Sequence, residues 1–369
     1  MKNIFLLCMA TTIIQITLLL PTFSASASSD GHPLQNEVSI GLEESEHSQS
    51  DFAETSLDAI PSFSDDEQVQ NDRQEQSIKN KPCAITWQPN GGRFGDDLAS
   101  YCRTKWLSRE LDIPLLCLPF PYSDQLMLHE NEELCTAECR QQFSKIVQLI
   151  KKPPYVLSKN NNTLYICRWK TEVTIDWFDQ SFLIELKKNI TPRYEIQKIE
   201  IPAEVVSIAA HVRNGGTFAA DTPEEKERCP LRFVPEEFFI DQIERLAAMF
   251  PADNLYVYIF TDHPEPAKLA KKFTRALNDP RITFDYRKED NSHKANVLED
   301  FFSMMDFDCL IRPGSNFTRF VQRLGNNKVV IYPESVKEIA PGKKVIDTIK
   351  VKTRTDSDER WKTQNITIA

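Results

Sequence analysis

The sequence lacks the signatures of several common enzyme classes. It contains no C-x-x-C pair, no G-x-S-x-G and no H-E-x-x-H, which argues against a cysteine-based zinc site, an α/β-hydrolase and a zinc metalloprotease. The dinucleotide fingerprint G-x-G-x-x-G and a P-loop ending in G-K-[ST] are also missing. A secreted hydrolase, the alternative enzyme class, is therefore disfavoured.

Basic stripes and further long apolar runs are missing as well. Because no basic cluster is interleaved with aromatic residues, a nucleic acid is not an expected partner. The first 27 residues predict a signal peptide, with one Lys, an apolar stretch and cleavage after Ala27. An uncleaved anchor through Ile4–Phe23 is the alternative. Either places the protein in the secretory pathway, secreted or extracytoplasmic, and membrane-anchored only if residues 4–23 are retained.

The acidic charge of the chain is concentrated in one segment. Residues 28–80 carry 13 Asp and Glu against two basic residues, a net charge of 2 − 13 = −11, within a whole-chain charge of −10. This stretch has few large apolar residues, so it cannot bury enough surface to offset the entropy of ordering. We predict a disordered acidic tether. The low isoelectric point therefore says nothing about the ligand of the folded part.

Cysteine usage leaves the redox state open. Nine Cys are present, of which Cys8 falls in the signal segment, and eight remain in the mature chain. An even number after a signal sequence permits disulfides, but their pairing cannot be deduced from the sequence. Cys135 and Cys139 are four residues apart without a His cluster, which argues against zinc.

From about residue 81 the chain alternates short apolar runs with amphipathic stretches. At 369 residues it suits two domains, and the alternation predicts an α/β fold with two Rossmann-like, doubly wound domains facing a cleft. The expected boundaries are 81–201, 202–345 and a poorly patterned tail at 346–369. We expect strands at 83–88, 113–118, 164–168, 205–212, 255–260, 282–286, 309–311 and 328–332. We expect helices at 98–111, 139–151, 178–189, 235–250, 266–277, 295–305 and 316–324.

Three loops at strand ends carry residues suited to an anion. The first, residues 90–97, holds Gly92 and Gly95 before a helix, where backbone amides and the helix dipole favour negative charge. The second is HVRNGG (211–216), where an Arg stands beside flexible backbone at the end of a strand. The third places Ser315, Asn316, Phe317 and Thr318 at a helix start. Each loop also has an ordinary structural explanation as a tight turn or an N-cap.

These motifs together resemble the fucosyltransferase superfamily, which includes the α-1,2-, α-1,6- and protein O-fucosyltransferases. GRFGDDL (92–98), HVRNGG, IFTDHPEP (259–266) and DFFSMMDFDCLIRPGSNFT (300–318) occur in the family's order and cover roughly residues 85–335. The composite pattern looks closest to a bacterial, chlamydia-like branch. The resemblance implies a GT-B-like fold, an acceptor-side domain at 81–201 and a nucleotide-sugar-binding domain at 202–345.

The resemblance also implies roles for individual residues. Arg213 would clamp the donor's β-phosphate, His211 would sit by the nucleoside, and Asp308 would read guanine. Ser315 and Thr318 match phosphate-facing hydroxyls. The family's second Arg is Asn214 here and its loop Asp is Gly216, so this chain departs from the pattern at two positions.

The resemblance implies inverting transfer of fucose from GDP-fucose to a glycan or protein hydroxyl, without a metal or a separate cofactor. An Asp306–Asp308 metal site is disfavoured, because the preceding helix is not expected to have ended at Asp306. The acceptor proton needs a base, for which Asp97 and Asp96 are the candidates, although each also suits a helix start. The alternative function is a non-catalytic secreted glycan- or nucleotide-binding protein, which Asn214 and Gly216 favour.

Overall fold

The computed structural model describes residues 83–150, 162–169, 171–215, 222–289, 297–355 and 358–368, together with 155, 157, 159, 291 and 295. The predicted signal segment and acidic tether lie outside the described residues. All described elements belong to one compact unit, Gln74–Ala369. In chain order they are β1 (Cys83–Trp87), α3 (Phe94–Leu111), η1 (Ser123–Gln125), α4 (Leu128–Asn131), α5 (Ala137–Gln141), β2 (Lys145–Leu149), β3 (Thr163–Cys167), α6 (Gln180–Asn189), β4 (Val206–Val212), α7 (Pro223–Arg228), α8 (Glu236–Met249), β5 (Leu255–Thr261), α9 (Pro266–Leu277), β6 (Ile282–Tyr286), α10 (Val297–Met304), β7 (Cys309–Ile311), α11 (Asn316–Leu324), β8 (Val329–Ala340), β9 (Lys343–Thr355) and β10 (Asp358–Thr367).

The first half of the described chain is built on a small parallel sheet. Its strand order is β1-β3-β2, and β3 pairs in parallel with both neighbours. Successive residues of β1 and β3 face opposite cores: Ile85 and Tyr165 pack with residues of α3, whereas Ala84 and Leu164 pack with Cys139 of α5. Both faces of β1 and β3 are therefore covered, as is usual in a parallel sheet, whereas the edge strand β2 is largely exposed.

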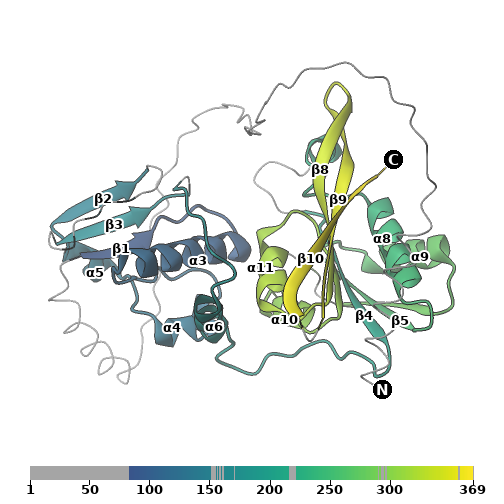
Figure 1. Ribbon diagram of the computed structural model, residues 1–369, viewed down its shortest axis with the longest axis horizontal. Coiled ribbons are helices and arrows are strands. Elements are labelled where there is room, and N and C mark those ends of the chain that lie inside the picture. The colour runs from purple at the N-terminus through teal and green to yellow at the C-terminus, as the bar shows by residue number, and fades with distance from the viewer. Residues whose placement is uncertain are drawn as a thin grey trace, which may run out of the picture. The chain divides into compact units, whose positions relative to one another are not determined.

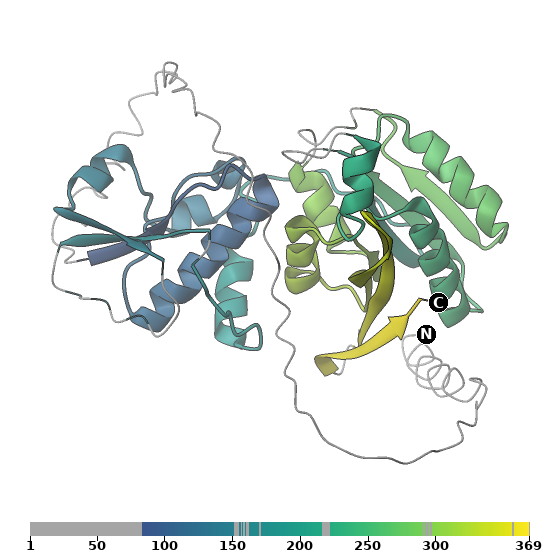
Figure 2. The same ribbon diagram turned by 90° about the horizontal axis from the view of Figure 1, so that it is seen from above.

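The second half is built on a seven-stranded sheet of order β10-β9-β8-β7-β4-β5-β6 (Figure 1). The five strands from β8 to β6 are parallel, and α10 and α11 cover one face while α8 and α9 cover the other (Figure 2). The chain moves outward from β4 through β5 to β6, then returns to the opposite side of β4 through β7 and β8. This reversal between β4 and β7 is the switch point of a Rossmann-type sheet. The expected α/β class with two parallel-sheet halves is confirmed.

Two predicted elements of the first half are wrong. A helix was expected over 139–151, but the structure ends α5 at Gln141 and forms β2 from Lys145. The β-branched pair Ile146 and Val147 favours a strand, and β3 supplies the hydrogen-bonding edge for it. The predicted strand 113–118 forms only isolated bridges, at Leu115 and Cys117.

The predicted C-terminal tail is also wrong. Residues 343–367 form β9 and β10, which extend the second sheet in antiparallel fashion. On β9 the buried residues Ile349 and Val351 alternate with Lys350 and Lys352. Because only one residue in two is apolar, this strand has a weaker sequence signal than the buried parallel strands. The second sheet therefore continues past residue 345.

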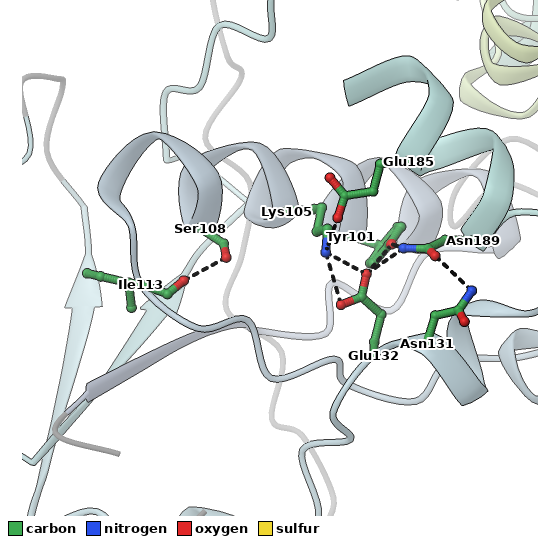
Figure 3. Close-up of polar contacts among 8 residues, drawn as sticks. All are labelled: Tyr101, Lys105, Ser108, Ile113, Asn131, Glu132, Glu185 and Asn189. Carbon is green, nitrogen blue, oxygen red and sulfur yellow. Dashed lines mark hydrogen bonds and ion pairs between the residues drawn. The ribbon is translucent and has the colours of Figure 1, made fainter. Parts of the chain in front are cut away.

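A buried polar network ties the helices of the first half together (Figure 3). The Glu132 carboxylate accepts hydrogen bonds from the Tyr101 hydroxyl at 2.7 Å and the Asn189 amide at 2.6 Å. Lys105 lies 2.9 Å from the same carboxylate and 2.8 Å from that of Glu185. Burial, followed by the charge of Glu132, raises the pKa of Tyr101 well above its usual value, so its hydroxyl stays a donor. The network joins α3 and α6 to the turn that follows α4.

The eight described cysteines are free thiols, and all except Cys229 are buried. The disulfides that the even number permits are therefore not formed among these residues. Within the described ranges, no helix is both long enough and apolar enough to cross a bilayer.

Candidate functional site

The switch point brings two of the three loops predicted from the sequence to one edge of the second sheet. β4 and β7 pair in parallel, so their carboxyl ends lie at the same edge. The loop after β4 begins with Arg213, and the loop after β7 leads into α11. In open α/β sheets this crevice is where ligands bind, because the first turns of the returning helices present free amides there.

The loop after β4 is organised by an aspartate of the neighbouring strand. Asp262, directly after β5, accepts hydrogen bonds from the backbone N–H of Asn214 at 2.6 Å and of Gly215 at 3.2 Å. Gly216, where the family has an Asp, lies outside the described residues. Asp262 belongs to the IFTDHPEP motif, but no role was expected for it. By accepting these two backbone hydrogen bonds, the Asp262 carboxylate fixes the conformation of the loop.

Two arginines converge on this loop from different halves of the chain. The Nη2 of Arg93 lies 3.3 Å from the Gly215 carbonyl oxygen, and the Nε of Arg213 lies 3.5 Å from the same atom. Burial, then the charges of Arg93 and Arg232, lower the pKa of Arg213 to about 10, so it stays charged at neutral pH. Asn214 replaces an arginine of the family pattern, and Arg93 brings a second cation to the same place. Sequence reasoning missed Arg93, because its proximity depends on tertiary structure.

The start of α11 has unsatisfied polar groups. Ser315 is the N-cap residue, but its side chain makes no capping hydrogen bond in the described structure. The Thr318 side chain is fully buried, and its Oγ1 has no hydrogen-bond partner among the described residues. Buried polar atoms are almost always paired in native proteins. An unpaired hydroxyl beside uncapped helix amides indicates a site for an oxygen-rich anion.

His211 lies beside this helix start. Its ring centroid is 5.8 Å from that of Phe317, and its buried Nδ1 has no partner in the described part of the chain. Burial lowers the pKa of His211 to about 4; the charge of Asp262 opposes the shift, and Arg213, Arg93 and Arg312 add to it. The imidazole is therefore neutral at pH 7 and offers a hydrogen-bond acceptor or donor rather than a charge.

The amino-terminal loop of α3 contacts the start of α11. Asn316 donates from Nδ2 to Oδ1 of Asp96 at 2.7 Å. The Phe94 ring packs 5.3 Å from Phe301 and 6.2 Å from Phe317, measured between centroids. Gly92 lies against Asp96, since a Cβ at Gly92 would be 2.4 Å from the Asp96 Cβ. All three predicted loops therefore meet around α11.

The two candidate bases have different environments. Asp96 is engaged by Asn316, as described above. Asp97 is buried, and burial together with the charge of Asp96 raises the pKa of Asp97 to about 6. An acid with a pKa near neutrality suits proton transfer.

Asp308 is not brought to this site. It precedes β7, and its Oδ2 accepts hydrogen bonds from the Ser207 hydroxyl at 2.8 Å and the Ser207 N–H at 3.1 Å. Lys328 lies 3.4 Å from its Oδ1. Ser207 is near the amino end of β4, so Asp308 lies at the sheet edge opposite Arg213. The expectation that it reads guanine there is corrected, because its carboxylate is already bound at the other end of the strands.

The start of α3 packs closely against the start of α11 at Gly95. A Cβ at Gly95 would lie 2.5 Å from the backbone nitrogen of Phe317 and 2.8 Å from its Cα. Backbone atoms cannot move aside as a side chain does, so we expect Gly95→Ala to lower the free energy of unfolding by about 1–3 kcal/mol. Urea denaturation measures this loss. Gly215→Ala is the control, since its nearest contact would be an ordinary 3.9 Å. Equal stability of both variants would contradict the close packing.

Among the described residues, no group of three or more His, Cys, Asp or Glu side chains gathers as a metal site would require. Asp306, half of the disfavoured Asp306–Asp308 pair, forms an ion pair with Lys198 at 2.7 Å. The two carboxylates therefore have separate partners.

Comparisons with known proteins give matches among solved structures alone. No protein-family model matches the chain, and no curated protein matches it. Among solved structures, the chain is similar to an Arabidopsis thaliana FUT1 mutant in complex with GDP. The identity is 13%, the alignment covers 73% of this chain and 75% of that one, and the TM-score is 0.47. The fold assignment rests on the strand order described above.

Proposed function

We propose that this protein is a glycosyltransferase that binds a nucleotide sugar at the carboxyl edge of β4 and β7. The observation that supports it most is the convergence of Arg93 and Arg213 beside the uncapped start of α11, where the Thr318 hydroxyl is unpaired. The charges of Asp262 and Asp96 offset part of the repulsion that Arg213 experiences from Arg93, and an anion bound beside the two guanidinium groups offsets more of it. A diphosphate fits this arrangement through its charge and its many acceptor oxygens.

The proposed reaction is transfer with inversion and without a metal. Negative charge develops on the departing diphosphate, and Arg213, Arg93 and the amides of residues 316–318 stabilise it. Ser315 and Thr318 donate hydroxyl hydrogen bonds to phosphate oxygens, and neutral His211 with Phe317 borders the nucleoside. The motif resemblance points to GDP-fucose as the donor. With Asp308 bound elsewhere, the group that reads the base is not among the residues proposed from the sequence.

The acceptor is a hydroxyl of a glycan or a protein, and Asp97 is the proposed base. Its raised pKa of about 6 makes it ionised at neutral pH while it remains basic enough to take a proton in the transition state. Asp96 holds the start of α11 through Asn316. We assign Asp96 to positioning rather than to proton transfer.

A calorimetric titration tests the proposal. We expect GDP to bind the purified protein, and to bind more tightly than UDP, ADP or CMP. Binding is expected to persist in EDTA, because both the charge and the donors come from protein groups. No binding by any of the four nucleotides would refute the site. Preference for UDP would keep the site but overturn the donor, and loss in EDTA with rescue by manganese would overturn metal independence.

A donor assay separates an enzyme from a non-catalytic binding protein, the alternative that Asn214 favours. A transferase releases fucose slowly from GDP-fucose when water replaces the acceptor, whereas a binding protein does not. Arg93 restores the second cation that Asn214 removes, which supports catalysis. Nucleotide binding without donor hydrolysis, and without transfer to any hydroxyl acceptor, would support the binding protein instead.

A further inference from the structure

A second group of cations lies on β9, on α11 and directly after β7, and it consists of residues other than those proposed to bind the nucleotide. Tyr332 of β8 pairs in register with Lys350 of β9, and Lys352 is two residues further along β9 on the same face. The Arg312 guanidinium stacks on the Tyr332 ring at 3.9 Å, and the Lys352 ammonium is 5.9 Å from that ring. Arg323 and Lys350 also act on the charge of Tyr332, and Arg319 of α11 is close enough to Arg312 to act on its charge. We name Arg312, Arg319, Arg323, Lys350 and Lys352 the Tyr332 cluster.

The Tyr332 cluster has a large excess of positive charge. Burial is the largest cause of the lowered pKa of Arg312 and of Lys352. The charges of Arg319 and Arg323 lower the pKa of Arg312 further. The charges of Arg323, Arg312 and Lys350 do the same for Lys352. Among the described residues, the carboxylate placed against the cluster is that of Glu334, and Lys350 already binds it. Five cations and one carboxylate leave a local charge of 5 − 1 = +4.

The most buried member of the cluster is Arg312, of which 4% is exposed. It donates to Gln322 Oε1 at 3.0 Å and to the Pro313 carbonyl at 3.1 Å, both neutral acceptors. Burial lowers the pKa of Arg312 to about 9, yet it remains charged at pH 7. A buried cation without a carboxylate partner costs free energy, and stacking on Tyr332 offsets only part of it.

The other members extend the cluster from the sheet to the solvent. Arg323 is half-buried with its guanidinium 4.7 Å from the Trp177 ring, and Arg319 is exposed. Lys350 and Lys352 are half-buried beside Tyr332. Guanidinium groups bind sulfate, phosphate and carboxylate through paired hydrogen bonds. An incoming oxyanion therefore meets accessible donors backed by a fixed buried charge.

We propose that the Tyr332 cluster is an oxyanion-binding site that takes a sulfate, phosphate or carboxylate group of a ligand other than the nucleotide. It uses none of the residues assigned to the diphosphate, so it does not depend on the proposed transferase function. Two sources share this chemistry: an acidic carbohydrate, and a free phosphate compound. A sulfated tetrasaccharide and inorganic pyrophosphate serve as the two probes.

The test is calorimetry of both probes on the full protein at physiological salt, in the presence of saturating GDP. We expect at least one probe to bind, and the double variant Arg319→Gln with Lys352→Gln to bind it about 10- to 100-fold more weakly, as loss of charge-assisted hydrogen bonds implies. The melting temperature is expected to stay unchanged, because Arg319 is exposed and neither residue has an ion pair in the described structure. Tighter binding of the tetrasaccharide identifies an acidic carbohydrate, and tighter binding of pyrophosphate a phosphate compound.

The matched control is Lys271→Gln with Arg275→Gln, which removes the same charge from the exposed face of α9. It should leave probe affinity unchanged. The proposal is overturned if neither probe binds the unmodified protein, if both double variants lose affinity equally, or if the probe is displaced by GDP. Should the double variant unfold, Arg319→Gln alone makes the same comparison with Arg275→Gln.

Discussion

Arg213→Ala is expected to weaken GDP binding about 10- to 100-fold while leaving guanosine binding nearly unchanged. Arg213 lies with Arg93 at the Gly215 carbonyl, and its charge-assisted hydrogen bonds to a diphosphate contribute about 1.5–3 kcal/mol. Guanosine lacks the phosphates, so its affinity does not depend on this side chain. The GDP affinity of Arg213→Lys should lie between those of the unmodified protein and Arg213→Ala, because an ammonium keeps the charge but cannot form the paired hydrogen bonds. Calorimetry of the unmodified protein and both variants with GDP and guanosine measures the six affinities.

The melting temperature distinguishes a ligand-binding arginine from a structural one. Arg213 lies 5.6 Å from the Phe233 ring, a contact of modest energy, so the alanine variant should melt close to the unmodified protein. Arg245→Ala is the matched control: Arg245 is half-buried on α8 and donates to Gln242 at 3.1 Å. It should leave GDP affinity unchanged. Equal GDP affinity in Arg213→Ala and the unmodified protein would show that this loop is an ordinary turn and does not bind the diphosphate.

Glu132→Ala is expected to lower the free energy of unfolding by about 3–5 kcal/mol, because it breaks a buried ion pair by removing one partner. Tyr101 and Asn189 are 0% and 3% exposed, and both lose the carboxylate to which they donate. Of the two ion pairs described for Lys105, the variant keeps the one with Glu185. Although burial lowers the pKa of Lys105, Glu132 and Glu185 outweigh it and raise that pKa overall, so the ammonium stays charged with half of its compensation gone.

Urea denaturation measures this loss, with an unchanged slope as the sign that the transition is still two-state. Glu132→Gln preserves the shape and one acceptor oxygen, so we expect a smaller loss of about 1–3 kcal/mol. Lys159→Ala is the control, since Lys159 pairs with Asp112 at 2.8 Å and the two side chains are 51% and 94% exposed, and such surface pairs contribute little. A loss for Glu132→Ala no larger than that of the control would show that the network does not stabilise the fold.

The sequence by itself determined most of the second sheet. β6, β7, α9 and α11 have the predicted bounds, and β4, β5, α8 and α10 differ by a few residues at most. These elements carry strong local signals: a strand buried on both faces is continuously apolar, as β5 is, and the helices have a clear apolar stripe. The sequence also located the three loops that surround the start of α11, because glycines and hydroxyl residues at strand ends are local features.

Tertiary structure alone decided what those loops contribute. Arg93 and Arg213 are separated by 120 positions in the chain, and only the packing of α3 against α11 brings both to Gly215. Asp308 is four positions from Arg312, yet a three-residue strand carries it to the opposite sheet edge, where Ser207 binds it. The strands β2, β9 and β10 have weaker local patterns than the buried parallel strands, and they form where a neighbouring strand edge supplies their hydrogen bonds. The fold determines which charges and hydrogen-bonding groups from distant parts of the chain come into contact. It therefore also determines which residues can act together.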